Sequence, residues 1–483
     1  MSVNECSSHR HFTTWLNYCL YNLESQSCTF ETIEIYSKNL QLSAMSPDYT
    51  KLLVARYLEE NGFTNTLSAF LDETDLSLVD LNNVALSGER MKLTELVKDR
   101  IKFDEQLLLK KERNRADNEF PLTKWNYRNT FKCEELEQSK SLPVTAKLVL
   151  LPTKELYLLI SKANKTTTVM KFSSDCKWES NNIIQHDNIC KEIGYFEGTN
   201  CCYFISIDGK LVTYDVLNTT MLQTFPLNTR MVSHAKIIPS NIKGRWYLSY
   251  CGLDSKLRVA EIILKQDDTF DLNILNQVQL LSKCTAIEAT LHPETGDPVI
   301  FVSRFEYSSI LVFCMTQANT ILHLSNIALN DAQFMSHSFH GLDMTINENA
   351  SNPKKSQIVV ATSHTPFMRL IVIDLTDIWK EIPSMLSEET FTSYNSIILN
   401  MLTNIPQDSY SQPILEWSDR EKGLIVGSND GLYAVDLSKN DSWQLSTYFA
   451  NRRIKLLTSD HRGLLVVGTA DKALFSCSFV KTS

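Results

Sequence analysis

Glycine is scarce in this chain, with 14 glycines among 483 residues. Loops that cradle phosphate groups depend on closely spaced glycines, so the sequence has little material for nucleotide-binding loops. It also contains no Gly-x-Ser-x-Gly elbow, no dinucleotide-binding fingerprint and no His-Glu-x-x-His pair. The sequence therefore predicts no catalytic site and no cofactor.

Long apolar runs are also absent. The most apolar stretches, 147–162 and 298–303, are too short or too interrupted by charge to cross a bilayer. The first residues do not have the basic and then apolar pattern of a secretory signal. Twelve cysteines without framework spacing fit a reducing compartment. We expect a soluble protein of the nucleus or cytoplasm with no membrane partner.

Basic residues are outnumbered, with 47 Lys and Arg against 56 Asp and Glu and a net charge of −9. Such a charge repels a phosphate backbone unless a local basic patch overrides it. Nucleic acid is therefore an unlikely partner.

Paired Cys-x-x-Cys ligands, which structural zinc sites commonly use, are missing from the densest group of possible metal ligands. Two adjacent cysteines of that group would point to opposite faces of a strand. We therefore predict buried thiols and no metal site. The group consists of Cys176, His186, Cys190, Cys201 and Cys202.

The residue pattern changes along the chain. From about Pro47 to Phe120 apolar residues recur at helical spacing, and from Pro121 onward short β-branched and aromatic runs alternate with turn residues. The predicted parts are a poorly defined N-terminal segment (1–44), a helical motif (45–80), a helical extension and linker (81–120) and a β-rich body (121–483).

The helical motif reads as two short helices. Leu53, Tyr57 and Leu58 lie at helical spacing, and the Asn61-Gly62 pair can adopt positive φ and end the first helix. Thr64 or Asn65 is predicted to cap the second helix. Isolated helices of this length are marginal in water, so a partner surface is implied.

This motif resembles a LisH motif, because it carries Tyr57-Leu58, Gly62-Phe63, Thr66-Leu67, Phe70 and Glu73 in the family's order. The resemblance implies a symmetric homodimer, or a higher oligomer, in which two helical hairpins form a four-helix bundle. The alternative is a hairpin packed on its own propeller. If the motif dimerises, a longer helix over 89–111 is expected to extend the dimer. The predicted dimerisation residues are Leu53, Tyr57, Leu58, Gly62, Phe63, Thr66, Leu67, Phe70, Leu71 and Glu73.

The β-rich body repeats one pattern, a hydrophobic strand, a tight polar turn and a second strand. Asp-Gly and similar pairs between apolar runs are strong hairpin signals. Corresponding turns lie 46 residues apart between Asp208 and Asp254, and 41 residues separate Gly427 from Gly468. A period of about 40–45 residues is typical of a propeller blade. The seven hairpins are 158–172, 204–216, 248–259, 300–313, 358–375, 424–437 and 465–477.

The body resembles WD-repeat proteins, although no Trp-Asp pair occurs. Asp215, Asp374 and Asp436 end strands at the corresponding position. The predicted fold is mainly β, a seven-bladed WD-repeat-like β-propeller preceded by the α-helical LisH dimerisation module. The segment 121–132 or the helix before it is expected to close the ring.

Together the two resemblances imply a non-catalytic scaffold that dimerises through LisH and binds partner proteins through the propeller. Proteins of this kind serve in ubiquitin-ligase, chromatin-regulatory and microtubule-motor assemblies. One alternative is an RNA-binding propeller. Another is an enzyme with a site in the central channel, which needs clustered carboxylates or histidines on the innermost strands, whereas such residues look scattered in the sequence.

Overall fold

A computed structural model gives the structure of two compact units, Met1–Asp104 and Glu105–Ser483. The described residues are 46–76, 93–94, 97, 100–101, 122–125, 130–173, 177–330, 339–347, 355–381, 391–394, 396–419, 423–460 and 463–480. The first 44 residues and most of the predicted 89–111 helix lie outside these ranges.

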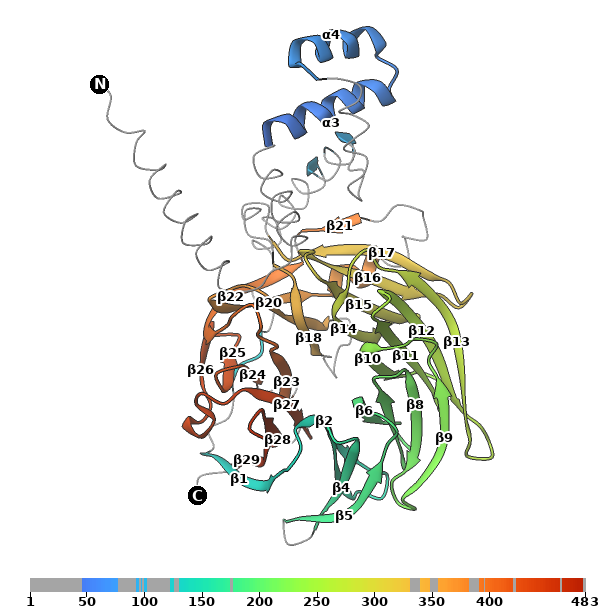
Figure 1. Ribbon diagram of the computed structural model, residues 1–483, viewed down its shortest axis with the longest axis vertical. Helices are drawn as coiled ribbons and strands as arrows, with labels where there is room; N and C mark the ends of the chain where they lie inside the picture. The colour runs from blue at the N-terminus through green and yellow to red at the C-terminus, as the bar shows by residue number, and fades with distance from the viewer. Residues whose placement is uncertain are drawn as a thin grey trace, which may run out of the picture. The chain divides into compact units, whose positions relative to one another are not determined.

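The described part of the first unit includes the short helices α3 (Ser46–Glu60) and α4 (Thr64–Thr74), drawn in blue in Figure 1. Gly62 has φ +73°, and the backbone N–H groups of Gly62 and Phe63 bond to the carbonyls of Glu59 and Leu58. This pair of bonds is a Schellman motif, which ends α3 where the sequence predicted. The predicted cap of α4 is wrong, because Phe63 precedes the helix and no side chain caps it.

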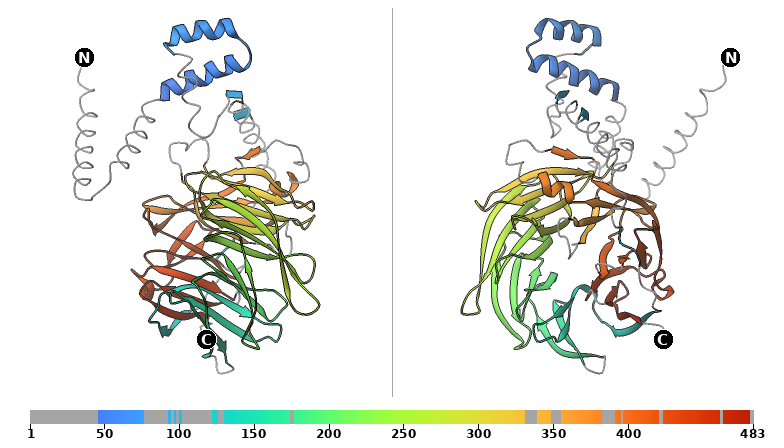
Figure 2. Two further views of the ribbon diagram at one scale, coloured as in Figure 1. Left: turned by 45° about the vertical axis from the view of Figure 1, so that its right-hand side comes forward. Right: turned by 180° about the vertical axis from the view of Figure 1, so that it is seen from behind.

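The second unit is a seven-bladed β-propeller, as the sequence predicted. Each blade is an antiparallel sheet of four strands, and the blades are numbered 1 to 7 in the chain order of their innermost strands. Blade 4 has a fifth strand, which is parallel to its neighbour. Figures 1 and 2 show the seven sheets around a common centre. The innermost strands of neighbouring blades contact one another around the whole ring. They are β2 (Pro143–Leu150), β6 (Cys190–Tyr195), β10 (Val232–Pro239), β14 (Cys284–Leu291), β18 (Gly341–Asn347), β23 (Ile414–Asp419) and β27 (Ile454–Ser459).

All seven predicted hairpins are the two middle strands of a blade. They are β3 (Leu156–Lys162) and β4 (Thr166–Phe172), β7 (Cys201–Ser206) and β8 (Lys210–Asp215), β11 (Arg245–Gly252) and β12 (Lys256–Leu264), β15 (Pro298–Arg304) and β16 (Ser309–Met315), β19 (Gln357–Thr362) and β20 (Phe367–Asp374), β24 (Gly423–Gly427) and β25 (Leu432–Asp436), and β28 (Leu464–Thr469) and β29 (Ala473–Val480). Their side chains are almost all buried between neighbouring blades, which explains why they are the most apolar segments of the chain.

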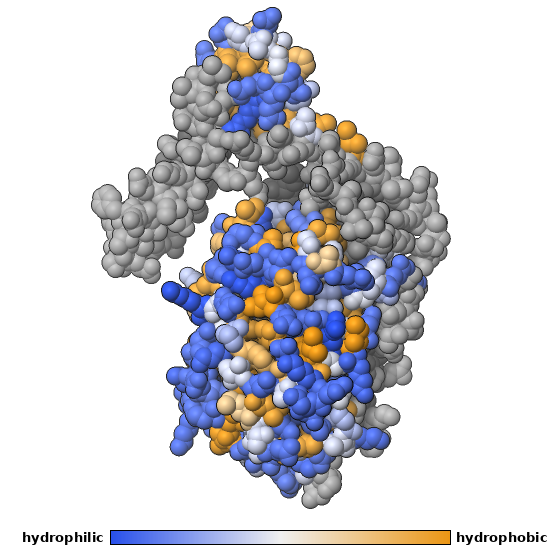
Figure 3. Space-filling model, turned by 90° about the vertical axis from the view of Figure 1, so that its right-hand side faces the viewer, coloured by the Kyte–Doolittle hydropathy of each residue, from blue (hydrophilic) through white to orange (hydrophobic). Residues whose placement is uncertain are grey.

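The outermost strands are more polar. They are β5 (Trp178–Gln185), β9 (Thr220–Pro226), β13 (Phe270–Gln279), β17 (Ile321–Ala328), β22 (Ile397–Pro406), β26 (Asp441–Gln444) and β1 (Thr130–Gln138). Exposed and half-buried residues dominate β5 and β9. Figure 3 shows the resulting flank, on which hydrophobic residues lie among hydrophilic ones.

Strand β1 closes the ring by pairing antiparallel with β29 in blade 7. The expectation for 121–132 is therefore met only at its end, since β1 begins at Thr130. The ring of Trp125, just upstream, lies 5.5 Å from Trp443 and 5.8 Å from Phe479, centroid to centroid. These contacts place Trp125 against blades 6 and 7.

An insertion between β20 and β22 joins blades 4 and 5. It contains the short helix α7 (Thr376–Glu381) and β21 (Phe391–Ser393), which adds to β17 of blade 4 in parallel. Trp379 of α7 is buried, and its ring lies 6.3 Å from Phe301 and 5.7 Å from His292. The described part of this insertion therefore packs into the core between the two blades.

Candidate functional site

The predicted dimerisation residues all lie on the hairpin of α3 and α4. Leu53 and Leu67 are buried. Four others are half-buried: Tyr57, Leu58, Phe70 and Leu71. The remaining four, Gly62, Phe63, Thr66 and Glu73, are exposed.

The hairpin has a small core of its own. Leu52, Ala55 and Leu67 are buried together, and four partly buried side chains pack around them: Leu58, Phe70, Leu71 and Leu76. The sequence analysis did not select Leu52, Ala55 or Leu76, although Leu52 and Ala55 lie three residues apart, as residues on one helical face do. The core is small for two helices, which leaves apolar surface at its edge.

Phe63 marks that edge. Its side chain is 49% exposed, and its ring lies 6.5 Å from the ring of Tyr57. Burying a phenylalanine side chain stabilises by about 1.5–3 kcal/mol, so this exposed ring favours a contact with another surface.

The central channel contains charged residues that the sequence analysis regarded as scattered. The structure places at least one on each of the seven innermost strands. A charged residue within the strand before each predicted hairpin was the signal that could have identified them. They include Lys147 on β2, Glu192 on β6, Lys236 on β10, Glu288 on β14, Asp343 on β18, Glu416 on β23 and Lys455 on β27.

These groups lie close enough to influence one another. Lys236 Nζ lies 2.7 Å from an oxygen of the buried Glu288 carboxylate. Burial lowers the pKa of Lys236, but the charges of Glu288, Glu192 and Glu416 outweigh this effect and raise it. Burial also raises the pKa of Glu192, and it raises that of Asp343 to about 7.

Polar side chains of the innermost strands also bond to neighbouring blades. Asp343 Oδ2 accepts a hydrogen bond from the Leu415 N–H at 2.7 Å, which joins blades 5 and 6. Glu416 Oε1 accepts one from the Ser459 N–H at 2.9 Å, which joins blades 6 and 7. Buried charged groups with such partners hold a structure together, and removing one partner is costly.

The group of possible metal ligands weighed in the sequence is spread over two blades, and its member Cys176 lies outside the described residues. His186 follows β5, while Cys190 lies on β6 and the last two cysteines on β7. Cys202 packs between blades 1 and 2 and Cys201 between blades 2 and 3, so their side chains point to opposite faces, as predicted. Within the described ranges no three His, Cys, Asp or Glu side chains are placed to hold a metal ion.

No described helix is long and apolar enough to span a membrane.

The three aspartates expected to end strands share one role. Asp215, Asp374 and Asp436 each accept a hydrogen bond from the backbone N–H two residues later, at the end of the third strand of a blade. These bonds form Asx turns that lead the chain into the next segment.

Two domains of one protein family match this architecture. Residues 48–82 match the domain described as "UCP007778, LisH domain", and residues 112–478 match "UCP007778, beta-propeller domain". The chain belongs to the UCP007778 family. The resemblance to a LisH protein with a propeller is thereby confirmed.

A relative of this UCP007778 protein occurs in Saccharomyces cerevisiae. The protein printed as "Uncharacterized protein YGR117C" is 27% identical over 481 residues, which cover 90% of this chain and 98% of the relative. The similarity thus extends through both domains. A LisH domain joined to a propeller indicates a protein-interaction scaffold.

Proposed function

We propose that this UCP007778 protein is a non-catalytic adaptor of a multiprotein assembly in the nucleus or cytoplasm. Its α3–α4 hairpin joins two copies of the chain, and each propeller binds partner proteins. Joining two propellers raises the effective concentration of the second one for any partner with two binding sites.

The observation that carries the proposal is the unfinished core of the hairpin. Among the described residues of the two helices only Leu52, Leu53, Ala55 and Leu67 are buried, and Phe63 is half exposed beside them. Leu58, Phe70 and Leu71 lie on α3 and α4 around this core and are only half-buried. A second hairpin packed against the two helices would therefore cover them.

The channel supports a structural role rather than catalysis. Glu288 pairs with Lys236, and Asp343 and Glu416 accept backbone N–H groups of neighbouring blades. A general acid or base must be free to exchange a proton with a substrate. These carboxylates are instead engaged in holding blades together.

Two differently tagged full-length copies, expressed together, test the proposal. Purification through one tag is expected to recover the other copy and a reproducible set of partner proteins. Phe70→Asp is expected to lose the second copy and keep partners that bind the propeller. Recovery of the second copy with Phe70→Asp would contradict the role of the hairpin, and a propeller that retains no partner would contradict the adaptor role.

A further inference from the structure

Four exposed apolar side chains lie on consecutive loops at one rim of the propeller. Met231 precedes β10, Leu253 is in the β11–β12 turn, Leu281 precedes β14, and Phe305 is in the β15–β16 turn. Their exposed fractions are 42%, 57%, 68% and 47%. Since each strand connection involved lies at the same end of its blade, the four residues form one surface, which we call the rim patch.

Hydrogen bonds link the neighbouring loops of the rim patch. The Leu253 N–H donates to the Met231 carbonyl at 3.1 Å, and the Phe305 N–H donates to the Lys283 carbonyl at 2.8 Å. Ser282 Oγ donates to the Phe305 carbonyl at 2.8 Å. The loops of blades 3 and 4 are therefore joined in two pairs.

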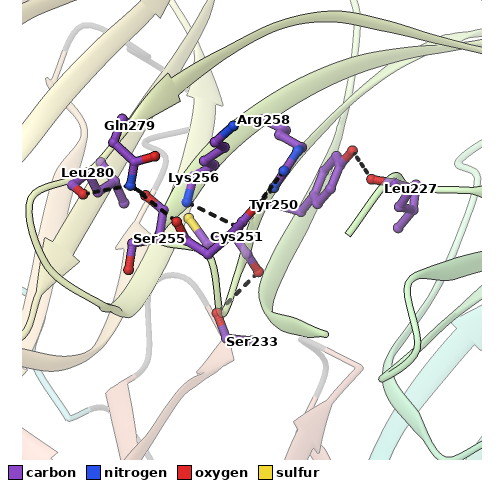
Figure 4. A network of polar contacts seen from close by, with 10 residues as sticks. Leu227, Ser233, Tyr250, Cys251, Ser255, Lys256, Arg258, Gln279 and Leu280 are labelled. Atoms are coloured by element: carbon purple, nitrogen blue, oxygen red, sulfur yellow. Dashed lines mark hydrogen bonds and ion pairs between the residues drawn. The ribbon is translucent and has the colours of Figure 1, made fainter. Parts of the chain in front are cut away.

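Gln279 connects these pairs. Its Nε2 donates to the carbonyls of Asp254, Ser255 and Leu280, each at 3.1 Å (Figure 4). Below the loops, Arg258 is buried and forms an ion pair with Asp254.

Two further bonds in Figure 4 anchor the base of the rim patch. Ser233 Oγ donates to the Cys251 carbonyl at 3.1 Å, and the buried Tyr250 hydroxyl donates to the Leu227 carbonyl at 2.6 Å. The apolar side chains are thus presented by loops that the core holds in place, which reduces the entropy lost on binding.

The rim patch is basic within an acidic protein. Its segments 227–231, 252–258, 280–283 and 304–308 contain five basic and two acidic residues, whereas the whole chain carries −9. Two of the five basic residues, Arg258 and Arg304, are buried. Asp254 is paired with Arg258, which leaves Glu306 as the exposed acid against the exposed Arg230 and Lys283. The charge surrounding the apolar side chains is therefore positive.

We propose that the rim patch binds an acidic amphipathic segment of a partner protein, whose aliphatic or aromatic side chains contact Met231, Leu253, Leu281 and Phe305. This proposal deepens the adaptor function, on which it rests. Complementary charge speeds encounter and selects the partner, while buried apolar anchors supply affinity. An extended anionic membrane is a poorer fit, because the net charge of −9 opposes its approach.

Binding of fluorescent peptides to the full-length protein tests the rim patch. The probe is a synthetic peptide with leucine and phenylalanine among aspartates and glutamates, and its partner probe replaces every acid with lysine. We expect the acidic peptide to bind at least about tenfold more tightly than the basic one, and to weaken as salt concentration rises.

Leu281→Ser and Lys283→Glu are each expected to weaken the acidic peptide about tenfold. Leu402→Ser, at a 52% exposed residue of β22, and Lys177→Glu, at an exposed residue before β5, are the matched controls and should leave binding unchanged. Equal binding of both peptides, or equal loss in the control variants, would overturn the proposal.

The same variants also test two other possible occupants of the rim patch, a second copy of the chain and a membrane. A lower oligomeric mass of Leu281→Ser would assign the rim patch to a second copy of the chain. Binding to phosphatidylserine vesicles that Lys283→Glu abolishes would assign it to a membrane. Either result overturns the proposal. Full retention of cellular partners by Leu281→Ser would place protein binding elsewhere on the propeller, so the adaptor function would stand and this inference would fail.

Discussion

Cys133 of β1 lies directly opposite Cys477 of β29 in an antiparallel pair. Burial raises the pKa of Cys477, and the neighbouring Cys133 thiol raises it further. The residues come from the beginning and the end of the propeller sequence. Their pairing therefore closes the ring, and the ring can form only when both ends of the propeller sequence are present.

Formation of a disulfide between Cys133 and Cys477 tests whether β1 closes the propeller ring. Facing residues of an antiparallel pair have Cα atoms about 4.5–5.5 Å apart, within the range of a disulfide. Prolonged oxidation of the folded protein at mildly alkaline pH is expected to join Cys133 to Cys477, as peptide mass mapping would detect. Cys133→Ser should abolish this product. A disulfide from Cys133 to any other cysteine would mean that β1 does not close blade 7.

The corner between α3 and α4 depends on Gly62. A Cβ at this position would meet nothing within 4 Å, so its constraint is the backbone φ of +73°. Gly62→Ala is expected to destabilise the hairpin by about 1 kcal/mol, because side chains other than glycine disfavour this conformation. Gly62→Asn is the matched variant and should cost less, since asparagine adopts positive φ more readily. Circular dichroism during heating measures both, and equal melting of all three proteins would contradict the Schellman geometry.

Asp343 makes the stability of the propeller depend on pH. Burial raises its pKa to about 7, compared with an ordinary value of 3.8. Between these two values the folded state binds more protons than the unfolded state, so the free energy of unfolding falls as pH rises. The contribution is about 1.4 kcal/mol for each pH unit.

Asp343→Asn should remove this contribution while keeping an oxygen that can accept the Leu415 N–H. Urea unfolding at pH 5, 6 and 7 measures it, and the wild-type protein should lose more stability over this range than the variant. Asp441→Asn, at an exposed residue of β26, is the control and should behave like the wild type. Parallel curves for wild type and Asp343→Asn would show that Asp343 does not titrate in this range.

The middle strands of the blades were predictable because they are buried on both faces. Segments such as Phe204–Asp215 combine an apolar run with an Asp-Gly turn, and both features are local in the sequence. The inner and outer strands are only partly buried, as the mixed pattern of β10 shows, so their apolar content is too low to mark them. Strand β1 was harder still, because its partner lies at the other end of the propeller.

The charged residues of the channel could not be brought together from sequence alone. Glu192 and Glu416 are far apart in the chain, and the closed ring is what places both near Lys236. The α3–α4 hairpin was easier to predict, since the Asn61-Gly62 corner is a local signal in the sequence. The N-terminal cap of α4 was not predicted correctly, because Phe63 takes that position without a side-chain hydrogen bond.

Sedimentation equilibrium of the full-length protein tests the central claim, that the α3–α4 hairpin joins two chains. We expect the wild-type protein to have at least twice the mass of one chain at micromolar concentration, and Phe63→Asp to have the mass of one chain. Asp72→Asn, at an exposed residue of α4, should keep the wild-type mass. A wild-type protein with the mass of one chain at every concentration, or Phe63→Asp with unchanged mass, would contradict the claim.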